Sequence, residues 1–387
     1  MLFQLGHLYT TKGDDSVIPV MKPKLPKIHE VQKYIEIIDA NRIYSNNGPL
    51  LKLYEERLAA FLSVDAKRLV CLNNATLALA GCLNRLTKPN VILPSYTFAA
   101  SALSAQFAGK RVCFVDVEVE TGCIDVRLIK KAMQFEVDSI VMPVSAFGAP
   151  VALDMYEDFE YVVIDAAASM GSLSCDLMDL QENWFVVFSL HATKVFGCGE
   201  GAVVICGSEN NANWLRSWSN FGFTGNRYPT QVGINAKLSE IMAAYGLAVL
   251  DQSDVESNEW SSLLNKIRSA SYPQRYRSGF ENMPGIRPYW LVNCSSPNER
   301  ESLQKFLAEN GVDSRRWWPR ALHTLSIFEN SPFFRDNYKG NSASEHLADT
   351  QLGLPFFRDL SDDYISTIIN LLNHFEEMRH DFRVDQI

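Results

Sequence analysis

The chain has 387 residues and a net charge of −9 at pH 7, with 47% hydrophobic and 21% charged residues. This length exceeds what one hydrophobic core usually serves, so we expect a large domain over residues 1–255 and a smaller one over residues 256–387. The acidic balance argues against nucleic acid as a partner. No apolar run approaches the roughly 20 residues that a membrane span needs, and Met1–His7 lacks the pattern of a signal peptide.

Cysteine and histidine spacing gives no sign of a disulfide framework or a metal site. The eight cysteines form no Cys-x-x-Cys pair, and the seven histidines form no His-x-x-x-His pair. Most of the cysteines lie in apolar segments, which is typical of reduced, buried thiols. We therefore expect a cytoplasmic protein that holds no metal ion.

From residue 27 to about 250, helical patterns alternate with short apolar strands. Helices are expected at Ile28–Ala40, Leu50–Leu62, Thr76–Leu86, Phe98–Ala108 and Val126–Ala132. Strands are expected at Leu69–Leu72, Val91–Leu93, Val112–Val115, Ser139–Met142, Tyr161–Ile164, Trp184–Phe188 and Ala202–Cys206. Such alternation predicts an α/β fold, with a mainly parallel seven-stranded sheet flanked by helices. Active sites of such sheets form at the carboxyl ends of the strands.

The second part of the chain has a different pattern. A long helix is expected over Ser239–Leu264, and the pattern after it is α+β. There we expect strands at Ile286–Val292 and Arg315–Trp318, and helices at Pro297–Asn310 and Tyr364–Met378.

Lys194 follows the apolar run Trp184–Phe188 and precedes a glycine-rich turn, so it lies at the end of a buried strand. A desolvated lysine loses its proton more readily, and the neutral amine can attack a carbonyl to form a Schiff base. The alternative is a solvated surface charge, as most lysines are. The turn Gly197–Ala202 matches the dinucleotide-binding fingerprint, but it leads into the strand-like Val203–Ile205 rather than a helix. We therefore reject a dinucleotide site there.

Three further segments also lie at the carboxyl ends of predicted strands. Asn73–Thr76 begins a helix, and the free N–H groups at that helix terminus could bind an anion. The alternative is that these residues only cap the helix. Pro94–Phe98 brings aromatic rings that could stack on a cofactor or pack in the core. Asp165 ends the apolar run Tyr161–Ile164, and a buried carboxylate needs a partner, such as a protonated ring nitrogen or a helix N-terminus. With Lys194, these segments supply what pyridoxal phosphate requires.

The sequence resembles the DegT/DnrJ/EryC1/StrS family of sugar aminotransferases, which are pyridoxal-phosphate enzymes of fold type I. The resemblance extends over nearly the whole chain, and the segments that carry it are Asn74–Leu79, Pro94–Phe98, Ser189–Gly201 and Gly233–Glu240. It implies a large cofactor-binding domain followed by a smaller C-terminal α+β domain.

The resemblance also implies roles for individual residues. Those implied to hold the cofactor are Ala75, Thr76 and Ser189 for its phosphate, Phe98 for the face of its pyridine ring and Asp165 for the ring nitrogen. Lys194 is implied to form the Schiff base with it. Asn235 would reach the cofactor of the other subunit, which implies a homodimer with shared active sites; a helix N-cap is the alternative. Where the family usually has Gln or His three residues after the aspartate, this chain has Ala168. This departure puts the role of that position in doubt and should loosen the cofactor's surroundings.

The activity implied is transfer of the amino group of L-glutamate to a nucleotide-linked keto-deoxysugar, for surface polysaccharide or natural-product sugars. Lys194 would act as general base and acid. Tyr44–Pro49 and Asn220–Phe223 are most similar to enzymes that aminate C4 of dTDP-4-keto-6-deoxyglucose. The alternatives are amination at C3, a UDP- or GDP-linked sugar, or a pyridoxal-phosphate-binding regulator without turnover.

Several residues are candidates for contact with the sugar nucleotide. They are Asn220, Arg227, Lys237, Arg316, Trp318 and His323, with Arg315 and Trp317 beside them. A diphosphate needs cations, although surface charge explains most arginines and lysines. Core packing is the alternative for the tryptophans.

Overall fold

A computed structural model of the chain describes residues 17–150, 152–172, 177–336 and 340–384. Met1–His7 and Cys175, on which expectations were stated above, lie outside these residues. The cysteines that the structure describes are free thiols, and all of them except Cys123 are buried. Among the described residues, no helix combines the length and apolarity needed to cross a membrane.

One sheet organises the first part of the chain. Its strands are β1 (Leu69–Leu72), β2 (Asn90–Pro94), β3 (Arg111–Val115), β4 (Ser139–Val141), β5 (Val162–Asp165), β6 (Trp184–Ser189), β7 (Ala202–Cys206) and β9 (Phe333–Phe334), in the order β1-β7-β6-β5-β4-β2-β3-β9. Strand β7 is antiparallel to both neighbours, and the other pairings are parallel. The expected mainly parallel sheet is thus confirmed. The two-residue β9 adds an eighth strand, which is too short to give a periodic signal.

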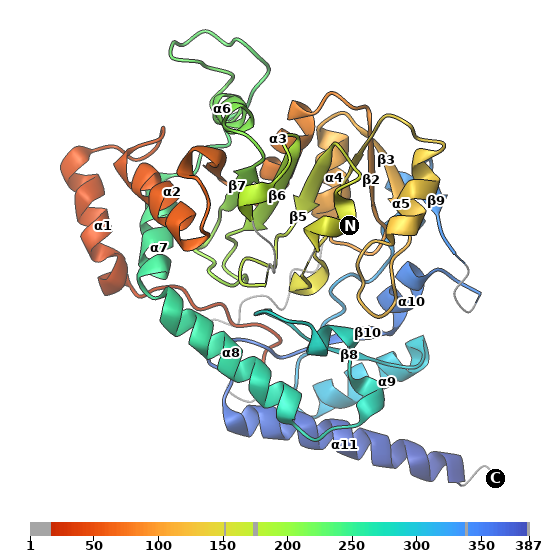
Figure 1. Ribbon diagram of the computed structural model, residues 1–387. Coiled ribbons are helices and arrows are strands. Elements are labelled where there is room, and N and C mark those ends of the chain that lie inside the picture. The colour runs from red at the N-terminus through yellow and green to blue at the C-terminus, as the bar shows by residue number, and fades with distance from the viewer. Residues whose placement is uncertain (1–16, 151, 173–176, 337–339, 385–387) are drawn as a thin grey trace, which may run out of the picture.

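Helices cover both faces of this sheet (Figure 1). One face is covered by α1 (Ile28–Asn41), α2 (Pro49–Phe61), α5 (Val126–Met133) and α7 (Glu240–Asp251), and the other by α3 (Ala75–Arg85), α4 (Ala99–Phe107) and α6 (Glu209–Trp218). Alternate strand residues enter separate cores: Ile92 and Ile164 pack on the α2 and α7 side, and Val91 and Val163 on the α3 and α4 side. Because both faces are covered, the strands are apolar at nearly every position.

The C-terminal part extends from the sheet as a second layer. Its elements are α8 (Ser253–Ser269), β8 (Trp290–Asn293), α9 (Pro297–Glu309), α10 (Ala343–Thr350), β10 (Gln351–Leu354) and α11 (Asp362–Val384), with β8 and β10 paired antiparallel. Figure 1 shows α8 running from α7 toward the other elements of this layer. The single helix expected over Ser239–Leu264 is interrupted at Gln252, where the backbone leaves the helical conformation. A division at residues 255 and 256 would fall inside α8, and the two-domain division remains a proposal.

Two expected strands differ from the structure. Strand β8 begins only at Trp290, four residues after the expected start at Ile286. The strand expected over Arg315–Trp318 is wrong, because only Arg315 pairs, in an isolated bridge with Gly353. The next residue, Arg316, uses its guanidinium to donate to the carbonyls of Pro319 and Ala348, so the chain turns away.

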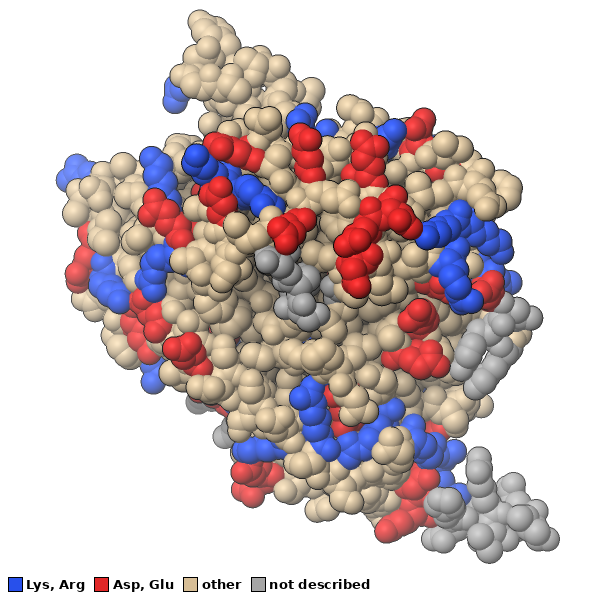
Figure 2. Space-filling model, in the orientation of Figure 1, with Lys and Arg blue, Asp and Glu red and all other residues tan. Residues whose placement is uncertain are grey.

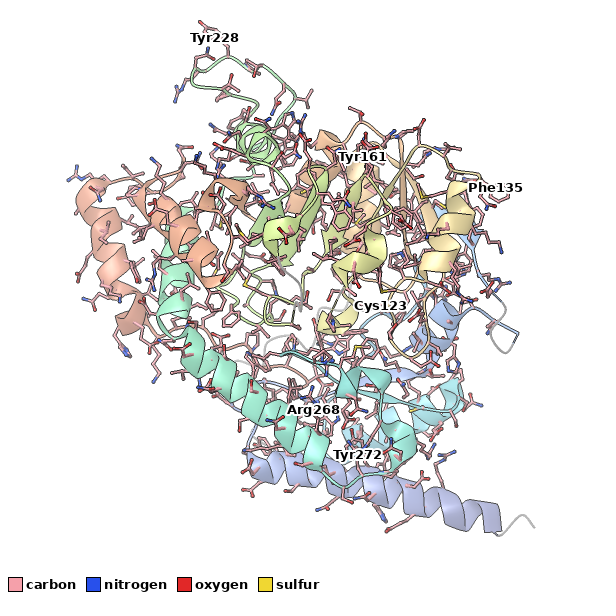
Figure 3. The ribbon with its side chains drawn as sticks, viewed as in Figure 1. Cys123, Phe135, Tyr161, Tyr228, Arg268 and Tyr272 are labelled. Carbon is pink, nitrogen blue, oxygen red and sulfur yellow. The ribbon has the colours of Figure 1, made fainter. Side chains whose placement is uncertain are left out.

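A segment that we call the arm (residues 221–232) connects α6 to α7 and projects from the body of the molecule (Figure 1). Tyr228 lies at its outer end (Figure 3). Figure 2 shows that the arm is almost free of charged side chains, whereas both signs of charge mix over the rest of that face. Phe221, Tyr228 and Val232 are exposed. Such exposed apolar side chains on a projecting segment are typical of a surface that another chain covers.

Candidate active site

The carboxyl ends of β1, β2, β5 and β6 meet at one edge of the sheet, as expected for strands running in the same direction. A cavity of about 950 Å³ opens at this edge. Its lining includes all the residues expected to hold a cofactor within one chain, namely Ala75, Thr76, Phe98, Asp165, Ser189 and Lys194. Segments far apart in sequence thus contribute to a single site.

Lys194 is presented by a tight turn after β6. The amide of His191 donates to the Ser189 hydroxyl over 3.2 Å, and the amide of Gly197 donates to the Lys194 carbonyl over 3.0 Å. A Cβ atom on Gly197 would lie 2.3 Å from the His191 carbonyl oxygen, so only glycine fits there. The Lys194 amine donates a hydrogen bond of 2.7 Å to the hydroxyl of Tyr289. The glycines therefore shape the turn that carries the amine, and the strand β7 after them agrees with the rejection of a dinucleotide site.

Asp165 is buried at the end of β5, with its carboxylate on the cavity. It accepts hydrogen bonds from the Ser101 hydroxyl at 2.7 Å and from the Ala167 amide at 3.2 Å. Burial raises the pKa of this carboxyl group, while the two hydrogen bonds and the charge of Lys194 oppose the rise. A desolvated carboxylate of this kind is stabilised by a cationic partner in the cavity.

The N-terminus of α3 forms another side of the cavity. Asn74 caps the helix, and its side chain accepts from the Leu77 amide at 2.9 Å. The first N–H groups of an α-helix, here those of Ala75 and Thr76, have no acceptor within the helix and attract anions. Next to them, the Asn73 side-chain oxygen is buried on the cavity and has no hydrogen-bond partner among the described residues. The free N–H groups of the helix suit a phosphate group, whereas the Asn73 oxygen is an acceptor and would need a donor.

The aromatic residues of Pro94–Phe98 have separate roles. Phe98 precedes the first turn of α4, lines the cavity and is 61% exposed, so its ring is available to a flat ligand. Tyr96 is buried and donates to the Gln351 side chain over 2.6 Å. An anion site, an available ring, a buried carboxylate and an amine thus line one cavity, and this donor set fits pyridoxal phosphate.

An aromatic cluster closes the cavity from the C-terminal side. Phe147 stacks on Trp318 with ring centroids 3.9 Å apart, and Tyr289 meets both Phe147 and Trp317 edge-on at 5.3 Å. Sequence reasoning missed Phe147 and Tyr289, because neither directly follows a predicted strand. Ala168 also lines the cavity and is buried. Gly148 packs closely against it, and a Cβ atom added to Gly148 would lie 2.7 Å from the carbonyl oxygen of Ala168.

The candidate substrate residues divide into those that line this cavity and those that do not. Lys237 and Trp318 line it, together with Arg315 and Trp317. Arg316 is occupied by main-chain carbonyls, as described above. His323 is turned into the interior, where its Nδ1 lies 2.6 Å from the Ser95 hydroxyl and its ring stacks on Phe333 at 3.7 Å. The structure therefore does not bring Arg316 or His323 to the cavity.

The remaining candidates are Asn220, at the base of the arm, and Arg227, which directly precedes Tyr228 within the arm. Asn220 and Arg227 line a separate surface cavity of about 670 Å³. Asn220 pairs with the exposed Asn235 in an antiparallel bridge and accepts a 2.9 Å hydrogen bond from the Lys237 amine. Within one chain Asn220, Arg227 and Asn235 are not on the lining of the Lys194 cavity, although Lys237 is. A role for Asn235 at a cofactor therefore needs a second subunit and remains a proposal.

The sequence profile of the DegT/DnrJ/EryC1/StrS aminotransferase family matches residues 27–373. The chain belongs to this family. The resemblance stated from the motifs is confirmed, and so is the enzyme class, a pyridoxal-phosphate-dependent aminotransferase. Solved structures that include a PLP-dependent aminotransferase of Bacillus cereus and sugar aminotransferases share the fold, which confirms fold type I.

Individual family members are similar over most of their length. The dTDP-4-amino-4,6-dideoxy-D-glucose transaminase of Shigella dysenteriae is 29% identical, with 92% of this chain and 98% of that protein aligned. The GDP-perosamine synthase of Escherichia coli O157:H7 is 25% identical, with 92% and 98% aligned. The crystal structure of DesI, solved in the presence of its TDP-sugar product, superposes with a TM-score of 0.80 at 25% identity and 96% coverage of both chains.

Proposed function

We propose that this enzyme uses pyridoxal 5'-phosphate to transfer the amino group of L-glutamate to C4 of dTDP-4-keto-6-deoxyglucose, giving dTDP-4-amino-4,6-dideoxyglucose. The observation that carries the proposal is that the Lys194 amine and the buried Asp165 carboxylate line one cavity with the N-terminus of α3. Pyridoxal phosphate, when bound, supplies an electron sink for the carbon that loses or gains the amino group.

The chain's own residues bind and orient the cofactor. The amides of Ala75 and Thr76 and the hydroxyl of Ser189 would hold its phosphate, where the dipole of α3 favours negative charge. Phe98 would offer its ring to the pyridine ring. Asp165 would accept a hydrogen bond from the protonated ring nitrogen and keep it charged, and that nitrogen would supply a cationic partner for the buried carboxylate.

Lys194 would hold the cofactor through its amine, and the same amine moves the protons of the reaction. Its neutral Nζ takes the proton from the α-carbon of glutamate in the first half-reaction. In the second half-reaction Nζ returns a proton to C4 of the sugar. The short turn that carries the lysine keeps the amine at the cavity during both steps.

The substrates are anions, and the cavity offers cations to them. Lys237 and Arg315 line it, and Arg315 lies over the Trp317 ring at 5.0 Å. They suit the carboxylates of glutamate and the diphosphate of a sugar nucleotide. The dTDP-sugar activity named for the Shigella relative and the TDP-sugar product of DesI support a thymidine nucleotide, and the GDP-perosamine synthase is the reason to test other nucleotides.

The active unit in this proposal is a cytoplasmic homodimer. The exposed apolar arm supports it, because a partner subunit would cover Phe221, Tyr228 and Val232. The exposed Asn235 at the base of the arm would then reach the partner's cofactor.

The test is spectroscopic. L-Glutamate added to the protein loaded with pyridoxal phosphate should abolish the visible absorbance band, and dTDP-4-keto-6-deoxyglucose should restore it. Matched additions of the 3-keto isomer and of UDP- and GDP-linked keto-sugars decide the acceptor, with products identified by NMR. Restoration by one of these alone would overturn the proposed sugar. A band unchanged by glutamate would overturn the aminotransferase and indicate a binding protein without turnover.

A further inference from the structure

Tyr289 is in direct contact with the amine of Lys194. The amine donates to its hydroxyl over 2.7 Å, across 95 positions of sequence, and lies 5.3 Å from the centre of its ring. We propose that Tyr289 is a positioning residue, which holds the Lys194 amine at the angle from which it captures the cofactor and exchanges protons with the substrate carbon. This inference rests on the proposed function for the chemistry that the amine performs.

The hydroxyl can act in this way because the ring of Tyr289 is itself fixed. It meets Phe147 at 78° and Trp317 at 80°, both with centroids 5.3 Å apart. The next residue, Trp290, begins β8 and pairs with Leu354 of β10. The position of the hydroxyl is therefore set by packing on two sides and by a strand directly after it.

The lysine needs such a contact more than the other site residues do. Its amine lies at the end of a flexible four-carbon side chain, and its backbone lies on a turn rather than on a helix or strand. Misplacement of a reacting group by about 1 Å can cost on the order of 10²-fold in rate.

A phenol suits this task for a chemical reason. A tyrosine hydroxyl accepts from N–H and also donates its own proton. It can therefore stay bonded to the amine in both protonation states through which a general base passes. An aliphatic or phenyl side chain in its place would fill the volume and leave the amine free to rotate.

Tyr289→Phe removes only the hydroxyl and keeps the contacts with Phe147 and Trp317. The matched control is Tyr34→Phe, which removes a hydroxyl bonded to Asp251 at 2.8 Å in the contact between α1 and α7. Three quantities are measured on each variant, in two experiments. One gives the rate at which apoenzyme captures pyridoxal phosphate on Lys194, followed by borohydride trapping and mass spectrometry. The other gives the single-turnover rate with L-glutamate, together with the glutamate concentration at half-saturation.

For Tyr289→Phe we expect capture to slow about tenfold and the single-turnover rate to fall on the order of 10²-fold. The half-saturating glutamate concentration should stay within about twofold, because an orientation defect acts on the rate. Tyr34→Phe should match wild type in all three quantities. Equal rates in the two variants would overturn the proposal, and so would a defect confined to half-saturation, which would make Tyr289 a substrate-binding residue.

Folding is monitored by the unfolding midpoint of each variant. If Tyr289→Phe unfolds, 3-fluorotyrosine at position 289 keeps the ring and the hydroxyl but makes that hydroxyl a weaker acceptor. The proposal expects slower capture at an unchanged midpoint, and unchanged capture would overturn it. Capture needs no glutamate. A wild-type protein that captures the cofactor but does not respond to glutamate would therefore refute the proposed function, while the comparison of capture rates would still test Tyr289.

Discussion

At Asp165, the requirements of stability and of catalysis oppose each other. The carboxylate is buried, its pKa is raised by burial, and its hydrogen bonds come from the neutral donors Ser101 and Ala167. In the absence of a cationic ligand, ionisation of this group disfavours the folded state. The same desolvation makes it a strong partner for a protonated ring nitrogen.

Asp165→Asn should therefore stabilise the apoenzyme and weaken cofactor binding. The folded-state pKa of the aspartate lies above its ordinary value of 3.8, so the apoenzyme loses stability as pH rises from that value through the folded-state pKa. At pH 7, above the ordinary value, this cost is present, and asparagine removes it. Urea unfolding of the two apoproteins at pH 7 measures this difference. Equilibrium dialysis should show weaker binding of pyridoxal phosphate by about 10-fold or more, since a hydrogen bond to a charged group contributes about 1.5–3 kcal/mol. Lower apoenzyme stability in the variant would contradict the account.

Some site residues were visible in the sequence, and others were not, for a physical reason. Lys194 and Asp165 each follow an apolar run, so their position at a strand end could be predicted from local pattern alone. Ser101 and Tyr289 act through contacts with residues 64 and 95 positions away. Only the arrangement of the sheet and the C-terminal layer brings them together, and no local pattern encodes that.

At the scale of elements, one motif residue serves the fold rather than the chemistry. Glu240 begins α7, is fully buried, and accepts hydrogen bonds from the amides of Leu50 at 2.8 Å and Leu51 at 3.0 Å. These amides belong to the first turn of α2, and N–H groups in the first turn of a helix have no acceptor within that helix. Glu240 lies in Gly233–Glu240, a segment that carries the family resemblance. It thus ties two helices together beside the site.

Glu240→Ala should lower the free energy of unfolding by about 2–4 kcal/mol, because each buried donor left without an acceptor costs about 1–3 kcal/mol. Chemical denaturation measures it. Glu301→Ala, on an exposed position of α9, is the control and should change stability by less than about 0.5 kcal/mol. Equal effects of the two substitutions would show that Glu240 does not support α2.

The short helix Leu322–Thr324 carries a second structural residue, His323. Burial lowers the pKa of its imidazole, with Arg335 acting in the same direction and the charges of Glu345 and Asp116 opposing. Protonation is thus easier in the unfolded chain, so stability is full above the unfolded pKa of about 6.5 and is lost as pH falls below it.

His323→Asn should remove this loss, since asparagine keeps a polar group near the Ser95 hydroxyl but does not titrate in this range. Unfolding midpoints between about pH 7.5 and pH 5.5 should fall more steeply for wild type than for the variant. The exposed His29 supplies the control, and His29→Asn should follow wild type. Parallel curves for wild type and His323→Asn would disprove the assignment.

The strands of the first part were predictable because burial on both faces of the sheet makes each strand a continuous apolar run. The segment Arg315–Trp318 shows where this reasoning fails. Its aromatic and basic side chains predict a strand, but tertiary contacts determine the conformation. Trp317 packs against Gly353, and the Arg316 guanidinium donates to main-chain carbonyls. A pattern of four residues cannot outweigh such contacts.

At the scale of the whole molecule, the Lys194 cavity and the base of the arm are separate within one chain. The account joins them through a homodimer in which Asn235 serves the partner's site. Lys194→Ala and Asn235→Ala should each be inactive as homodimers for this reason. When the two proteins are dissociated and reassociated together, a mixed dimer contains one intact site, made of the lysine of one subunit and the asparagine of the other.

The mixture should recover about a quarter of wild-type activity, because statistical exchange makes half of the dimers mixed and each has one intact site of two. Steady-state assays on the mixture and on the separate homodimers measure this. Wild type mixed with an equal amount of Lys194→Ala should keep half of wild-type activity whether or not subunits exchange, so this mixture controls for dilution and for losses during reassociation. Absence of recovery, with exchange verified by mass spectrometry, would refute a shared site.

Pyridoxal phosphate is proposed to attach to Lys194 in the cavity at the edge of the sheet. Borohydride reduction of the loaded protein, followed by peptide mapping, tests this most directly. The account predicts a pyridoxyl group on Lys194 that is lost, with the visible absorbance band, in Lys194→Ala and kept in Lys237→Ala. A pyridoxyl group on another lysine of the wild-type protein, or reduction without any label on the chain, would contradict it.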